Sequence, residues 1–269
     1  MIPLSIASPA LIIFFALILI ILERTFPYSM SQDLFRKGFF NDLFFYSLLQ
    51  SYLLSFVIAW VTVGIDRLTG LSRFPVLSHW NIWQVVILSL IVHDFYIYWF
   101  HRWQHSNSVL WRIHEAHHSV EDVDWLAGSR SHSLEILINQ TMEFAPLSLL
   151  GAPAEAILMK ATIDACWGMY IHSNIDVRSG ALQYVINGPE MHRWHHAIEV
   201  TQGGLNYSTK FAIWDWIFRT AYRPENLKPS AYGISNPSFP SGYISQHLYA
   251  FRRFMLDPEP EDGNLKNYS

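Results

Sequence analysis

The segment His93-Asp-Phe-Tyr-Ile-Tyr-Trp-Phe-His101-Arg-Trp-Gln-His105, followed by His114-Glu-Ala-His117-His118, decides the fold of this chain. Six of the thirteen histidines of the protein lie within residues 93–118. In a helix, side chains four residues apart project from the same face, so His101 and His105 would point in one direction. His114 would meet His117 and His118 in the same way. The segment therefore predicts helices that bring imidazole rings together.

The HxxHH spacing returns far downstream, at His192, His195 and His196. A single histidine pair on a helix is as often a buried or interfacial pair as a metal site. Eight neutral rings packed together are different, because each buried ring needs a hydrogen-bond partner and protonated rings repel one another. A structural zinc ion takes about four ligands. Eight histidines instead suit two metal ions, each with an open position for an oxidant or substrate.

The composition points to a membrane. Apolar residues make up 51% of the 269 residues, mean hydropathy is +0.16, and only 15% of the residues are charged, against about 25% in soluble domains. The formal charge of −4 and the absence of a run of Lys and Arg argue against nucleic-acid binding. The single cysteine, Cys166, excludes a disulfide framework, a cysteine-ligated iron–sulfur cluster and a CxxC zinc site.

Apolar segments predict an all-α integral membrane protein that crosses the bilayer several times. Residues 4–22, 43–65 and 80–101 are each long enough for one span. A cleaved signal peptide is a weaker alternative for the first, because no basic segment precedes it. Residues 134–171, broken at Pro146 and Gly151-Ala-Pro153, predict a helical hairpin, although its short limbs also suit a partial re-entrant hairpin. Either form leaves both histidine-rich regions on one side of the membrane.

His93 and Asp94 lie about two helical turns before His101, at a depth where ionisable groups are costly. A His–Asp hydrogen bond between helices and a supporting role beside the metal are equally good interpretations. The sequence thus divides into an N-terminal membrane region (1–79), a catalytic region with a third span and a hairpin (80–224), and a loop-rich C-terminal tail (225–269) around a short helix near His247 to Phe254.

Positive charge predicts the orientation. The connector after the first span contains more Lys and Arg than the loop after the second, and further arginines flank the first histidine-rich region. Cytoplasmic loops carry the excess of Lys and Arg. The metal centre, in a helical histidine-rich cap, is therefore expected on the cytoplasmic side of the membrane. The connector contains Arg24, Arg36 and Lys37, the loop after the second span contains Arg67 and Arg73, and the arginines around the histidine-rich region are Arg102, Arg112 and Arg130.

The order HxxxH, HxxHH, HxxHH resembles the fatty acid hydroxylase and sterol desaturase superfamily of membrane-bound, non-haem di-iron enzymes. The resemblance covers roughly residues 90–224. Ser208 and Arg219 depart from it, since the superfamily tends to have glycine there. Further matching motifs are Tyr98-Trp-Phe-His101-Arg102, Asp124-Trp-Leu-Ala-Gly-Ser-Arg130-Ser-His132, His172-Ser-Asn174, Pro189-Glu-Met-His192, Asn206-Tyr and Trp214-Asp-Trp-Ile-Phe218.

The resemblance implies which residues hold metal. The eight histidines of the three motifs would be metal ligands with a direct role in catalysis, with His172 as a ninth ligand and His132 as a tenth candidate. A surface or supporting histidine is an equally good interpretation of His132. His79 and His247 match no motif. The eight motif histidines are His101, His105, His114, His117, His118, His192, His195 and His196.

The chemistry favours two iron ions with O2 as co-substrate. Imidazole suits iron, zinc and copper alike, but oxidation of an unactivated C–H bond needs a redox metal. The sequence contains no nucleotide fingerprint and no haem or iron–sulfur ligand set. Electrons must therefore come from outside, and the resemblance implies a ferredoxin or b-type cytochrome fed by NAD(P)H. The expected function is hydroxylation or desaturation of a sterol-like or fatty acyl lipid, in lipid biosynthesis or modification.

Two other classes of function stay open at this point. A zinc-dependent membrane hydrolase would use fewer ligands plus a glutamate base, and Glu115 is the only acid within a histidine motif. A metal transporter would place its ligands along a path through the membrane, whereas these histidines gather near one interface. A requirement for O2 and a reductant separates the first function from both alternatives.

Overall fold

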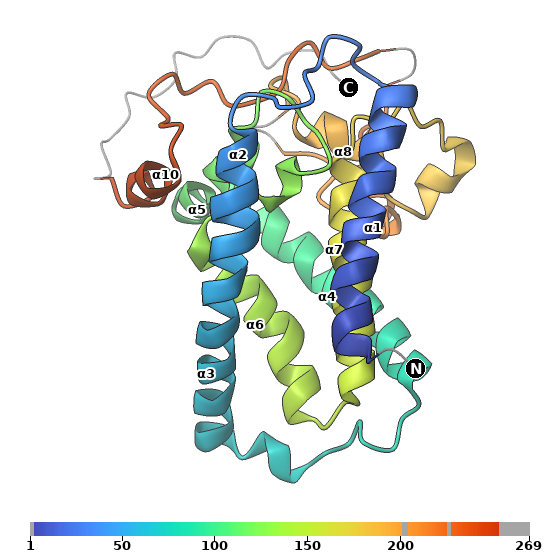
Figure 1. The fold of residues 1–269 in the computed structure, drawn as a ribbon, viewed down its shortest axis with the longest axis vertical. Helices are drawn as coiled ribbons and strands as arrows, with labels where there is room; N and C mark the ends of the chain where they lie inside the picture. The colour runs from blue at the N-terminus through green and yellow to red at the C-terminus, as the bar shows by residue number, and fades with distance from the viewer. Residues whose placement is uncertain (1–2, 201–203, 225–226, 253–269) are drawn as a thin grey trace.

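The computed structural model describes residues 3–200, 204–224 and 227–252. These residues are helical, apart from loops and two isolated β-bridges that join Pro27 to Ile175 and Ala197 to Tyr232. The long helices stand side by side, and a cap of short helices and loops lies at one end of the bundle (Figure 1). The prediction of an all-α fold is confirmed for the described part of the chain.

The bundle consists of α1 (Leu4–Thr25), α3 (Ser51–Thr69), α4 (Ile82–Ser106), α6 (Ser133–Leu149) and α7 (Ala154–His172). A π-helix, η1 (Asp42–Gln50), joins the short α2 (Phe39–Asn41) to α3. The cap contains α5 (Ser108–His118), α8 (Pro189–His195), α9 (Ile213–Ile217) and α10 (Tyr243–Tyr249). Single 3-10 turns are η2 (Leu71–Arg73), η3 (Ala127–Ser129) and η4 (Gly180–Tyr184).

Three helical segments are long and apolar enough to span a membrane: α1, the continuous helix Phe39–Thr69, and α4. Only 17%, 17% and 28% of their most apolar stretches are buried inside the protein. Large apolar side chains such as Ile13, Phe56 and Trp60 are exposed on these helices. An apolar surface of this extent needs a lipid environment, because soluble proteins rarely expose one. The three predicted spans are therefore present as helices.

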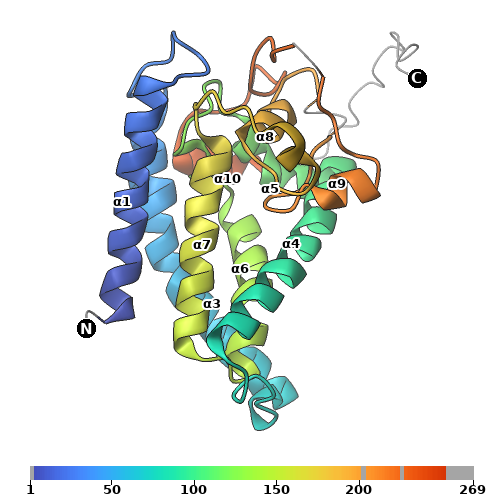
Figure 2. The same cartoon turned by 90° about the vertical axis from the view of Figure 1, so that its right-hand side faces the viewer.

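The predicted hairpin is formed by α6 and α7, which turn at Gly151 with φ 78°. Its limbs of 17 and 19 residues are not among the candidate spans. They nevertheless run along the bundle, because α6 packs against α3 and α7 packs against α1 and α4. The hairpin starts and ends at the cap, so both histidine-rich regions lie at the same end of the bundle, as Figure 2 shows.

Asn107 creates the sharp turn between the first two histidine motifs. Its side-chain oxygen accepts hydrogen bonds from the backbone N–H groups of Val109 and Leu110 and thus caps α5. Its extended backbone, at φ −124° and ψ 120°, ends α4 at Ser106. The chain folds back at this point, and the last turns of α4 face α5. The two histidine motifs on either side of Asn107 consequently face each other.

A buried ion-pair network fastens the cap to the start of the second span. Arg130 donates two hydrogen bonds to Asp42, at 2.7 and 2.9 Å. Arg36 pairs with Asp42 at 2.8 Å and with Asp124 at 2.9 Å. Asp42 is completely buried. A buried charge needs such partners, because its removal from water is otherwise very costly.

The structure corrects two details. His93 and Asp94 do not bond to each other: Asp94 accepts hydrogen bonds from the Thr209–Phe211 loop and from Trp214, whereas His93 lies beside Lys160. The short C-terminal helix begins at Tyr243, four residues earlier than predicted, and ends at Tyr249. Its predicted end near Phe254 and the tail beyond it lie outside the described residues.

Candidate metal centre

The structure brings nine of the ten candidate histidines together in two adjoining groups within the cap. In each group, one ring nitrogen from every histidine lies within 4.8 Å of the others. Each histidine comes from a helix or a helix end, so the backbone holds it firmly. The first group contains His101, His105, His114, His118 and His195, and the second contains His117, His172, His192 and His196.

Each HxxHH motif is divided between the two groups. His114 and His118, four residues apart on one face of α5, join the first group, while His117 points to the second. The motif of α8 is divided in the opposite sense, since His192 and His196 join the second group and His195 joins the first. Two short helices therefore hold both groups together, and neither group is complete without both.

The distances between ring nitrogens fit metal coordination. Nε2 of His192 lies 2.9 Å from Nε2 of His172 and 3.2 Å from Nε2 of His196. In the first group, Nε2 of His114 lies 3.1 Å from Nε2 of both His101 and His118. Ligands about 2.1 Å from one metal ion are separated by about 3 Å. These nitrogens cannot all be satisfied by donating to one another, whereas one ion per group would satisfy them together.

In four of these histidines the opposite ring nitrogen contacts a backbone oxygen. Nδ1 of His101, His172 and His195 lies 2.7 Å from the backbone oxygens of Tyr207, Gly168 and Leu205. Nδ1 of His117 lies 3.2 Å from the oxygen of Arg130. An Nδ1–H that donates to a carbonyl leaves Nε2 with a free electron pair directed at the metal, which is how metal-binding histidines are commonly oriented.

The cap keeps its histidines neutral. Burial, followed by the neighbouring imidazoles, lowers the pKa of all six histidines of α5 and α8 motifs well below the usual value of 6.5. A neutral imidazole is the form that binds a metal ion. These six rings are therefore in the form that binds metal at neutral pH. The six are His114, His117, His118, His192, His195 and His196.

His132 is the candidate that the structure does not bring to either group. Its Nδ1 accepts a hydrogen bond from the N–H of Leu134, and its Nε2 lies 3.2 Å from the backbone oxygen of His247. The rings of His132 and His247 stack with centroids 4.5 Å apart. His132 thus caps α6 and packs against α10, which agrees with the supporting role considered above. It has no ring nitrogen left for a metal ion in this arrangement.

Glu135 was not identified from the sequence. Its Oε1 accepts hydrogen bonds from Nδ1 of His114, at 2.8 Å, and from Gln104, at 2.9 Å. It therefore orients a candidate ligand and strengthens its basicity. An acid at the start of an otherwise apolar helix was the available signal. The backbone oxygens of Leu205 and Tyr207 carry no sequence signal at all, because every residue has one.

A cavity of about 200 Å³ lies against the two groups. His101, His114, His117, His172 and His192 form one part of its wall, and His93, Asp164, Trp167, Thr209 and Lys210 form another. An apolar cavity of about 310 Å³ between α4 and α6 shares His93 with it. A second apolar cavity, of about 500 Å³ between α1 and α7, shares Trp167. The site has room for a small reactant beside the metal positions and for hydrocarbon nearby.

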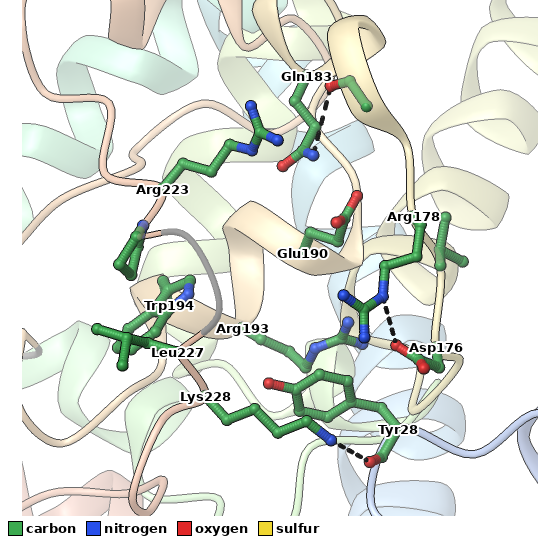
Figure 3. A pocket seen from close by; sticks show the side chains of 13 residues that line it. Tyr28, Asp176, Arg178, Gln183, Glu190, Arg193, Trp194, Arg223, Leu227 and Lys228 are labelled. Carbon is green, nitrogen blue, oxygen red and sulfur yellow. Dashed lines mark hydrogen bonds and ion pairs between the residues drawn. The ribbon is translucent and has the colours of Figure 1, made fainter.

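The outer face of α8 lines a different cavity, of about 510 Å³. Figure 3 shows Glu190, Arg193 and Trp194 of this helix among its lining residues. Arg193 donates to the backbone oxygens of Ser173 and Ile175, and its guanidinium lies 3.8 Å from the ring centroid of Tyr28. These contacts anchor α8 to the end of α7, and so fix the histidines on its inner face.

Comparisons with known proteins agree with this geometry. The fatty acid hydroxylase family profile matches residues 86–220. Ornithine lipid hydroxylase OlsE of Rhizobium tropici is 30% identical over 88% of this chain and 73% of its own length. Human alkylglycerol monooxygenase is 31% identical over 62% of this chain, which corresponds to 36% of that protein.

A plant relative is more distant: methylsterol monooxygenase 2-2 of Arabidopsis thaliana is 26% identical over 58% of this chain and 59% of its own length. No solved structure gives a significant match. The matched region contains every histidine of the two groups. The resemblance seen in the histidine motifs is confirmed, and the chain belongs to the fatty acid hydroxylase family.

Proposed function

We propose that this protein is an O2-dependent, di-iron lipid hydroxylase of the membrane. The observation that carries the proposal is the convergence of nine histidines, eight of them buried, on two adjoining positions beside a cavity. Membership of the fatty acid hydroxylase family supports it, as do the hydroxylase and monooxygenase activities named for its relatives. A lipid substrate agrees with the apolar cavities along the bundle.

The nine histidines of the two groups are the proposed ligands. Two bound iron ions would activate O2 for attack on a C–H bond of the lipid. The overall reaction consumes one O2, two electrons and two protons, and it yields the hydroxylated lipid and one water. The backbone and Glu135 contacts of the rings would position the ions, and the burial of eight of the nine histidines would keep bulk water away.

The electron donor and the orientation are proposals of the same kind. We propose a ferredoxin or a b-type cytochrome, reduced by NAD(P)H, because the sequence contains no motif for a redox cofactor of its own. We place the cap on the cytoplasmic side, where such donors are found, in agreement with the Lys and Arg of the cap-side connector. The orientation is tested by replacing the exposed Lys37 with cysteine and labelling that cysteine in intact cells.

The hydrolase alternative has lost its only support. Glu115 does not face the metal positions: its carboxylate pairs with Arg252 at 2.9 Å and accepts a hydrogen bond from Asn236 at 3.2 Å. The three relatives named above are a lipid hydroxylase and two monooxygenases, not hydrolases. A transport function is not supported either, because the nine histidines lie on α5, on α8 and its C-cap, and on the last turns of α4 and α7, which meet at one end of the bundle.

Lipid mass spectrometry tests the proposal. Wild-type protein, His117→Ala and His79→Ala are expressed in a host that supplies oxygen, electrons and candidate lipids. His79 is exposed in the loop at the far end of the bundle, so its variant is the matched control. We expect one lipid to gain a single oxygen atom with wild type and His79→Ala only. Equal lipid profiles in all three strains would refute the proposal.

A further inference from the structure

The wall of the metal-side cavity contains charged side chains at a depth where lipid-binding sites are usually apolar. Asp164 of α7 and Lys210 form an ion pair of 2.8 Å, and both line the cavity. Their side chains are 16% and 9% exposed. Ionisable residues at membrane depth are costly, and they generally mark a functional site.

Asp164 and Lys210 belong to a larger cluster of charged side chains, and only some of its members face the cavity. Lys160 contacts Glu143, Asp164 and His93, and it occupies the centre of the group His93, Glu143 and Asp164. That position is therefore taken by an ammonium group, and a metal ion has no place there. Lys160 does not line this cavity and Glu143 lines the neighbouring one, whereas Asp164 and Lys210 reach its wall. Glu135 also lines the cavity, but its Oε1 already bonds to His114 and Gln104. Asp164 and Lys210 are thus an acid and a base presented side by side.

The cavity has the size of a polar headgroup. Its volume of about 200 Å³ equals about seven water molecules at about 30 Å³ each. This space suits a group of amino-acid size and excludes a complete acyl chain. A hydrocarbon placed against Asp164 and Lys210 would also remove water from both charges without replacing its hydrogen bonds. The apolar cavity of about 310 Å³ that shares His93 suits hydrocarbon instead.

We propose that this cavity binds a zwitterionic lipid headgroup, in which Asp164 pairs with an amine and Lys210 with an acid group, while the acyl part lies between α4 and α6. The binding itself needs no metal, but the chemical consequence of this binding rests on the proposed function. The headgroup, and not the distant part of the chain, then lies against the metal positions. Oxygen is inserted into the polar part of the lipid.

Binding tests the recognition without any turnover. The probe is Nα-palmitoyl-lysine, and two analogues have either the amine acetylated or the acid methylated. The metal-free full-length protein in detergent is titrated with each lipid, and binding is followed by native mass spectrometry. We expect each masked analogue to bind at least tenfold more weakly than the zwitterion. Equal affinities for the three lipids would overturn the proposal.

Two variants assign the contacts. Lys210→Met should weaken binding of the zwitterion and of the acetylated lipid about tenfold, and leave binding of the methyl ester unchanged. Asp164→Asn should weaken binding of the zwitterion and of the methyl ester, and leave binding of the acetylated lipid unchanged. Lys210→Arg and Asp164→Glu should restore part of the affinity. A uniform loss with all three lipids would show a merely structural ion pair.

Lys37→Met and Glu121→Gln are the matched controls, since these side chains form an exposed ion pair of 2.9 Å away from the cavity. Iron-loaded wild type is then supplied with O2, a reduced donor and the zwitterion, and tandem mass spectrometry locates the added oxygen. Oxygen on the lysyl part is the expected result, and oxygen on the palmitoyl chain would contradict it. Selective binding without any oxygenation would refute only the proposed function.

Discussion

At the residue scale, the site depends on how each imidazole is oriented as well as on where it lies in the sequence. The spacing of the motifs predicted that eight histidines would meet and the resemblance added His172, and all nine do. It did not predict the division of each HxxHH motif between two groups, because this depends on the angle between α5 and α8. The acceptors for Nδ1 are mostly backbone oxygens, such as that of Tyr207, which no sequence pattern reveals.

Gly128 makes room for His172. A Cβ added at Gly128 would lie 2.6 Å from Nδ1 of the His172 ring, which is closer than such atoms approach. We therefore expect Gly128→Ala to displace His172 and to reduce bound iron from two ions per chain towards one, measured by elemental analysis. The control is Gly64→Ala in α3, a helix that carries none of the nine histidines, where an added Cβ meets nothing within 4 Å. Equal iron contents in the two variants would contradict this role.

Arg219 occupies a left-handed backbone conformation, with φ 59°. It is one of the two positions where the sequence departs from the glycine of the superfamily, and only glycine adopts this conformation without strain. Arg219→Gly should stabilise the protein by about 1 kcal/mol. The measurement is the midpoint of thermal unfolding in detergent, and a lowered midpoint would show that the Arg219 side chain contributes more than its backbone costs.

At the scale of helices, hydropathy predicted the spans and the hairpin, because the period and length of an apolar helix are local properties. The connections within the cap could not be predicted. The network of Arg36, Asp42, Asp124 and Arg130 joins two segments that are distant in sequence, residues 36–42 and 124–130. Arg130 was noted only as a positive charge and as part of a motif. Its partner, Asp42, cannot be identified without the fold.

The network provides a prediction about stability. Asp42→Asn leaves two buried guanidinium groups without their shared carboxylate, so we expect a loss of about 3–5 kcal/mol of stability. Glu121→Gln breaks an exposed pair with Lys37 and should cost no more than about 0.5 kcal/mol. The fraction of folded protein after a heat step, followed by gel filtration, compares the two variants. Similar losses would refute the structural role of the network.

At the scale of the whole molecule, the fold builds a buried polar centre at the end of an apolar bundle. A fall in pH should destabilise this centre. The unfolded chain takes up protons on histidine near pH 6.5, whereas the folded cap resists protonation because the pKa of six histidines is lowered. The stability of the metal-free protein should therefore fall as the pH drops below about 6.5.

Thermal unfolding of the metal-free protein at pH 7.5 and pH 5.5 measures this effect. Each histidine that stays neutral when folded contributes up to about 1.4 kcal/mol per pH unit, so the midpoint should fall by several degrees or more. A midpoint that is unchanged, or higher at pH 5.5, would show that the cap accepts protons easily. In that case the rings would not be held as neutral ligands.

The central claim is that two iron ions are bound by the nine histidines. It is tested most directly by elemental analysis and Mössbauer spectroscopy of the full-length protein, purified from cells grown with ⁵⁷Fe. The account predicts two iron ions per chain with nitrogen-rich coordination, and loss of iron in His118→Ala and His196→Ala but not in His79→Ala. One metal ion per chain, or zinc in place of iron in active protein, would contradict it.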